Sequence, residues 1–128
     1  MFEATAKLKI REGEVEGFKQ QAAEVMRRMK ELDDQPVRYD WFVNEDGTEC
    51  EVREVYESAD ALLEHQRLVA DAKIELLRNF VAGHTMSFYA PPSQTLAQAL
   101  DAMGAVYEQY SFFQGLESDV KVPDEVPA

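Results

Sequence analysis

Cysteine is almost absent from this chain, since Cys50 is the single one among 128 residues. One thiol excludes an intramolecular disulfide and any metal site built from several cysteines. Long apolar runs are also missing, and no stretch approaches the roughly 18 residues that a membrane-spanning helix needs. Residues 1–4 have neither a basic nor an apolar signal region, so we expect no secretory signal. These absences predict a cytoplasmic protein.

Positive charge is scarce too, with 13 Lys and Arg against 25 Asp and Glu and a formal net charge of −12. Binding to a phosphate backbone or to anionic lipid depends on clustered basic side chains. We therefore expect neither nucleic acid nor a membrane as a partner. The hydrophobic share of 45% and the aromatic share of 10% are ordinary for one globular domain and too high for disorder.

Hydrophobic periodicity divides the chain into strands and helices. Alternating apolar residues, typical of strands, occupy residues 2–10, 37–43, 50–56 and 82–90. Helical spacing occupies residues 15–32, 58–80 and 94–103. Ser58 and Ser93 are suitable N-caps, and Gly47 favours a hairpin turn between the second and third strands. Residues 106–113 are aromatic-rich and predict a fifth strand or an arm.

This order predicts a ferredoxin-like α+β unit, β-α-β-β-α-β, with an extra C-terminal helix and a strand or arm. Two helices cover one face of such a sheet. Two helices cannot cover all four of the aromatic residues Tyr39, Trp41, Phe42 and Phe88. We therefore expect a homodimer formed through the uncovered sheet face.

Several segments together resemble a known family. They are residues 3–7, the turn at 11–13, residues 38–41, the turn at 46–47, residues 54–58 and residues 61–65. In this order and spacing the sequence resembles the antibiotic biosynthesis monooxygenase-like (ABM) domains of the dimeric α+β barrel superfamily. The resemblance covers residues 3–89, and residues 94–116 are similar to the C-terminal helix and arm of that group. It implies one domain over residues 1–116. The acidic tail at 117–128, with two prolines and four acidic residues, is predicted to be flexible from its composition.

The resemblance also implies a homodimer with a pocket in each protomer between sheet and helices. In the oxygenase members the pocket takes an aromatic or quinol-type molecule and uses no cofactor. The substrate loses a proton, its anion reduces oxygen, and recombination followed by loss of water gives a quinone. His65 matches a helix histidine of the group, whereas Ala70 stands where relatives often carry a second histidine.

His65 and Glu54 are the candidate catalytic residues. His65 lies on an apolar helix stripe, where it is a general base, a substrate contact or a buried neutral histidine. Glu54 shares its strand face with apolar residues, so desolvation would raise its pKa unless it is paired. It is then a base or the group that orients His65. Alternatively, Glu54 lies on the solvent-exposed face of the sheet or forms an ion pair with Arg38 or Arg53.

An aromatic cavity is the second element of the predicted site. Its candidate substrate-binding residues are Tyr39, Trp41, Tyr56, His84 and Phe88. Aromatic walls suit a flat ligand, although aromatic residues at strand period equally form a core or an interface. We expect no metal, because no carboxylate cluster accompanies the two histidines, and we interpret Cys50 as inert packing.

The sequence thus predicts a cofactor-independent monooxygenase acting on an aromatic or quinol-type small molecule. The alternative is a non-catalytic dimeric domain that binds a small molecule, with haem as one candidate ligand. The missing second histidine and the lack of a strong catalytic motif favour this alternative.

Overall fold

The alternating segment at the N-terminus forms the middle strand of a five-stranded sheet, β1 (Phe2–Ile10). The structure is a computed structural model that describes residues 1–116. The other strands are β2 (Pro36–Val43), β3 (Glu49–Tyr56), β4 (Val81–Phe88) and β5 (Tyr107–Gln109). The order is β2-β3-β1-β4-β5, with β5 parallel to β4 and the other neighbours antiparallel. This is the predicted α+β ferredoxin-like arrangement with added C-terminal elements.

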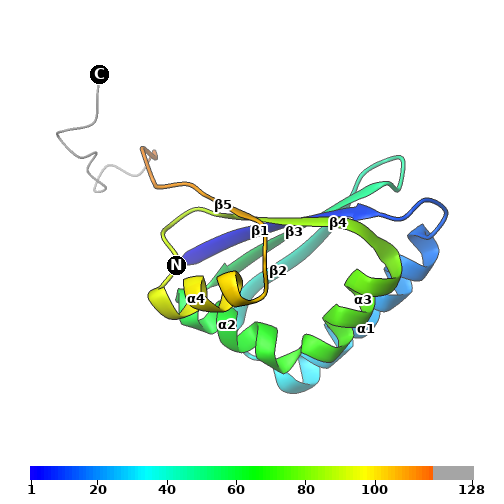
Figure 1. The fold of residues 1–128 in the computed structure, drawn as a ribbon, viewed down its shortest axis with the longest axis horizontal. Coiled ribbons are helices and arrows are strands. Elements are labelled where there is room, and N and C mark those ends of the chain that lie inside the picture. The colour runs from blue at the N-terminus through cyan, green and yellow to red at the C-terminus, as the bar shows by residue number, and fades with distance from the viewer. Residues whose placement is uncertain (117–128) are drawn as a thin grey trace.

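The helices all lie on one face of the sheet (Figure 1). They are α1 (Val15–Leu32), α2 (Ala59–Leu68), α3 (Ala70–Phe80) and α4 (Gln94–Ala102). The side chains of Ser58 and Ser93 accept hydrogen bonds from Ala61 N and Leu96 N, so both predicted N-caps are confirmed. Within residues 1–116, no helix is long and apolar enough to cross a membrane.

The single helix predicted over residues 58–80 is wrong, because the chain breaks it at Val69. The backbone of Val69, at φ −114° and ψ 17°, leaves the helical region, while its side chain is buried. The apolar stripe continues across the break, which is why periodicity alone did not reveal it. The consequence is that α2 and α3 meet the sheet separately, with Leu62 buried under one and Leu76 under the other.

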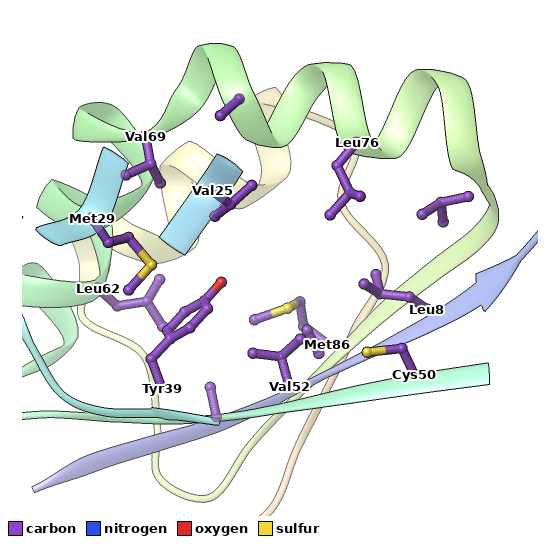
Figure 2. Packing of buried hydrophobic residues seen from close by; sticks show 14 of the residues in the cluster. Leu8, Val25, Met29, Tyr39, Cys50, Val52, Leu62, Val69, Leu76 and Met86 are labelled. Atoms are coloured by element: carbon purple, nitrogen blue, oxygen red, sulfur yellow. The ribbon is translucent and has the colours of Figure 1, made fainter. Parts of the chain in front are cut away.

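The strand register decides which side chains face the helices. Tyr39, Glu54, Ala4 and Phe88 are neighbours in one row across β2, β3, β1 and β4. Trp41, Val52, Ala6 and Met86 form the next row. Both rows contribute to the core, whose packing under the helices is seen in Figure 2.

Three of the four aromatic residues that predicted dimerisation lie on the covered side of the sheet. Tyr39 and Phe88 are buried in the core, and Trp41 packs against it. Only Phe42 of the four cited residues alternates to the opposite, uncovered face, where it is 52% exposed.

The C-terminal arm is only partly a strand. Gly104, at φ 67°, follows α4, and three residues of the predicted 106–113 strand pair with β4. Beyond them, Tyr110 N donates to Phe88 O, and the Tyr110 ring stacks on Tyr89 with 5.8 Å between centroids. The predicted acidic tail at 117–128 lies outside the described residues.

Candidate functional site

His65 lies in the interior, on the side of α2 that faces the sheet. Its Nδ1 lies 2.5 Å from Oδ2 of Asp33, the residue that follows the last turn of α1. Both side chains have 0% of their surface exposed. The other ring nitrogen, Nε2, is buried and has no hydrogen-bond partner among residues 1–116. An orphaned buried nitrogen is uncommon in proteins and marks a position that a ligand can satisfy.

The surroundings of His65 keep its ring neutral. Burial, followed by the nearby charge of Lys73, lowers the pKa of His65 to about 2. Burial also raises the pKa of Asp33. An ionised Asp33 only accepts hydrogen bonds, so Nδ1 of the neutral ring carries the proton and donates it. The lone pair is then on Nε2. With a pKa this low the enclosed ring is a weak base, so its use as a general base requires an opened site or a bound ligand that relieves the burial.

Glu54 forms a second buried pair, with Tyr56 on the same strand. The Tyr56 hydroxyl donates to Glu54 Oε1 at 2.6 Å. Burial is the main cause that raises the pKa of Glu54 and of Tyr56. The predicted place of Glu54 as the group that orients His65 is wrong, because Asp33 occupies it.

The alternative pairings of Glu54 are not formed either. Arg38 binds Asp40 at 2.5 Å, and Arg53 lies over the Phe42 ring on the uncovered face. Glu54 faces the opposite way, toward the helices, and is 3% exposed. It is therefore a buried carboxyl group next to the aromatic residues around His65.

Two of the five predicted wall residues lie against His65, and a third, Trp41, adjoins one of them. The ring centroids of Tyr39 and Tyr56 lie 5.0 and 5.6 Å from that of the imidazole. Trp41 lies edge-on to Tyr39 at 5.8 Å, and its Nε1 donates to the sulfur of Met26 at 3.1 Å. Figure 2 shows the Tyr39 side chain rising from β2, with its hydroxyl directed toward the helices.

The other two predicted wall residues lie elsewhere. Phe88 packs against Phe2 and Tyr107, each with 5.5 Å between centroids. His84 is opposite Leu8, two rows along β4 from Phe88, and its side chain is exposed. Neither residue is in contact with the His65 ring in the way that Tyr39 and Tyr56 are.

Sequence reasoning missed Asp33 and Lys73. Nothing in the run after α1 distinguishes Asp33 from Asp34, since only the tertiary fold brings Asp33 to His65. Lys73 did leave a signal: it is four residues after Val69 and three before Leu76, on the apolar stripe of α3. Its Nζ lies 5.4 Å from the centroid of the Tyr39 ring.

A large hollow of about 850 Å³ lies on the opposite side of the sheet. Its lining includes Lys7, Lys9, Phe42 and Arg53, which alternate away from the helices. It is thus separated by the sheet from the cluster around His65. Within residues 1–116, no group of three or more His, Cys, Asp or Glu side chains is placed to hold a metal ion.

Comparison with known proteins gives structural matches alone. No family model matches the chain, and neither does any curated protein sequence. MupZ from Pseudomonas fluorescens matches with a TM-score of 0.70 and 22% identity, over 94% of this chain and 92% of that one.

Shorter proteins match as well. A structure named antibiotic biosynthesis monooxygenase has a TM-score of 0.62 and 14% identity, over 71% of this chain and 98% of that one. Rv0793 from Mycobacterium tuberculosis has a TM-score of 0.60 and 18% identity, over 73% and 96%. The chain therefore has the α+β ferredoxin-like fold of the antibiotic biosynthesis monooxygenase structures, as its sequence resemblance predicted.

Proposed function

We propose that the protein is a cofactor-independent monooxygenase that acts on an aromatic or quinol-type small molecule, with His65 as its general base. One observation carries the proposal: Asp33 holds Nδ1 of a fully buried imidazole, and Nε2 is left without a partner. A carboxylate behind a histidine fixes the tautomer and stabilises the imidazolium that forms when the base accepts a proton. A buried neutral histidine needs a partner for its Nδ1–H in any case, so the orphaned Nε2 is the feature that a purely structural role leaves unexplained.

In this mechanism Nε2 removes a proton from a phenolic hydroxyl of the substrate. The resulting anion is electron-rich and reduces O₂ directly, and recombination followed by loss of water completes the reaction. For a substrate with an activated CH₂ group, CH₂ and O₂ give C=O and H₂O, so one oxygen atom enters the product and the other leaves as water. The protein supplies the base, orients the substrate and excludes water from the site.

The aromatic neighbours of His65 suit a flat substrate. Tyr39 and Tyr56 lie within 5.6 Å of the imidazole, centroid to centroid, and Trp41 adjoins Tyr39. Because His65 is fully enclosed, a substrate reaches Nε2 only when neighbouring side chains or helices move apart. Opening on this side is therefore part of the proposal.

A homodimer formed through the uncovered sheet face is also proposed. That face carries the 850 Å³ hollow and exposed Phe42, and the exposed aromatic residues Tyr110, Phe112 and Phe113 follow β5. Exposed aromatic clusters of this kind are typical of interaction surfaces. A second copy of the chain is the partner that the resemblance implies.

Oxygen uptake tests the proposed activity. Hydroquinones and anthrone-like phenols are offered to the wild type, to His65→Gln and to Arg67→Gln, which changes an exposed residue of the same helix. Loss of a general base lowers the rate about 100-fold or more. We expect uptake in proportion to wild-type and Arg67→Gln concentration and almost none with His65→Gln. Uptake that is equal in all three proteins contradicts the assignment of His65.

Non-catalytic binding is the second candidate, and the enclosure of the whole cluster favours it. In that case no substrate is consumed above its rate of autoxidation, while a flat ligand still binds. Haem is the special case, because it needs an accessible nitrogen beside a flat cavity. With His65 at 0% exposure, we expect no shift of the Soret band when haemin is added to the wild type.

A further inference from the structure

We infer that Lys73 is the anion-binding residue of this interior site, and that the ligand it receives is a planar aromatic anion. The inference rests on the proposed function only in that the ligand occupies the same space beside His65. It goes further by naming the charge of the ligand and the side chain that recognises it.

The first support is position. The Lys73 ammonium lies 5.4 Å from the centroid of Tyr39, and the His65 ring lies 5.0 Å from the same ring. Lysine and histidine thus both lie next to the Tyr39 ring, although they come from different helices. A flat molecule that enters beside Tyr39 when the enclosed cluster opens would meet the imidazole and the ammonium together.

The second support is the absence of a direct counter-ion. Among residues 1–116, no carboxylate forms an ion pair with Lys73. The nearby acids, Asp33 and Glu54, are already bonded to His65 and Tyr56. Their charges favour a protonated lysine, but desolvation outweighs them and lowers its pKa. An ammonium without a direct partner in such a place is costly to a fold, and an anionic ligand removes this cost.

The third support is the orphaned Nε2 of His65, which independently indicates a ligand in the same place. The two groups have complementary tasks. Nε2 takes the proton of a hydroxyl group, and the ammonium stabilises the negative charge that remains on the ring system. Electrostatic stabilisation of a developing charge by a preorganised cation is usually among the largest contributions to catalysis.

Calorimetry with two ligands of the same shape isolates this role. The probes are 1-naphthoate, an anion, and 1-naphthamide, its neutral counterpart. They are titrated into the full-length wild type, Lys73→Met and Lys73→Gln. Lys19→Met is the matched control, because it removes the same charge from an exposed position on α1. Near-ultraviolet circular dichroism verifies that each variant is folded. If Lys73→Met is not correctly packed, Lys73→Gln is used in its place.

We expect wild type and Lys19→Met to prefer 1-naphthoate. A charge-assisted contact corresponds to about tenfold to 100-fold in affinity. Both Lys73 variants should lose this factor for 1-naphthoate and bind 1-naphthamide as the wild type does. An unchanged ratio of the two affinities in the Lys73 variants overturns the inference, and so does failure of the wild type to bind either probe.

The binding ratio is independent of oxygen chemistry. If the ratio of the two affinities changes in the Lys73 variants but no oxygen is consumed with any substrate, the monooxygenase proposal is wrong and the anion site is supported. If oxygen is consumed in a His65-dependent reaction but the ratio of affinities is unchanged in the Lys73 variants, the activity is supported and the role of Lys73 is wrong.

Discussion

At the level of single residues, the buried His65–Asp33 pair connects the chemistry of the site to the stability of the fold. The pKa of His65 is about 2 in the folded protein and 6.5 when unperturbed. Below pH 6.5, therefore, His65 binds a proton in the unfolded chain but not in the folded one. The stabilising contribution is complete above pH 6.5 and is lost as the pH falls toward 2.

Urea unfolding at several pH values between 7 and 5 measures this effect. Below pH 6.5 the wild type should lose stability relative to His65→Gln by about 1.4 kcal/mol per pH unit. The comparison with the variant is needed because the pKa values of Asp33 and Glu54 are raised in the folded protein. Protonation of these two carboxyl groups therefore stabilises the fold as the pH falls, which opposes the effect of His65. Parallel curves for the two proteins contradict a neutral buried His65.

Cys50 gives a second prediction for a single residue. Burial raises the pKa of its thiol to about 11, and the residue is 1% exposed. At pH 8 this leaves roughly 200-fold less thiolate than a pKa of 8.5 would give. Ellman's reagent should therefore react with the native protein at least about 200-fold more slowly than with the protein in urea. Equal rates show that Cys50 is accessible.

At the level of elements, the close packing of α1 against α3 depends on Gly17. A Cβ atom built on Gly17 lies 2.5 Å from Cε1 of Phe80, the last residue of α3. Gly17→Ala should destabilise the protein by about 1–3 kcal/mol, although alanine is the better helix former. Ala23→Gly, at an exposed position of α1, measures helix propensity alone. Increased stability of Gly17→Ala in urea contradicts the close contact.

The elements also show what the sequence could predict. Period-two alternation correctly placed Tyr39, Glu54 and Tyr56 on one face of the sheet, since a strand fixes the direction of every side chain. Helical periodicity likewise placed His65 inward. It did not reveal the break at Val69, because the apolar stripe continues through it. Asp33 could not be foreseen, because its partner is 32 residues away and only tertiary packing brings them together.

At the level of the whole molecule, the uncovered sheet face should mediate dimerisation. Light scattering of the wild type should give about 29 kDa, twice the 14.6 kDa of one chain. Phe42→Asp places a charge on that face and should shift the mass toward one chain. Ile74→Asp is the matched control, because Ile74 on α3 is 49% exposed and Phe42 is 52% exposed. A stable monomer in the wild type contradicts the proposed dimer.

The strand order has a consequence for the synthesis of the protein. Of the strands in this sheet, the middle one, β1, is synthesised first, yet its two neighbours end at Tyr56 and Phe88. One edge of β1 is therefore unpaired until Tyr56 has been synthesised and the other until Phe88 has, and such long-range pairing folds slowly. A nascent chain that ends before β4 exposes an open, apolar edge. Translation arrest in that interval should produce aggregates, whereas arrest after Phe88 should release a sheet with β1 fully paired.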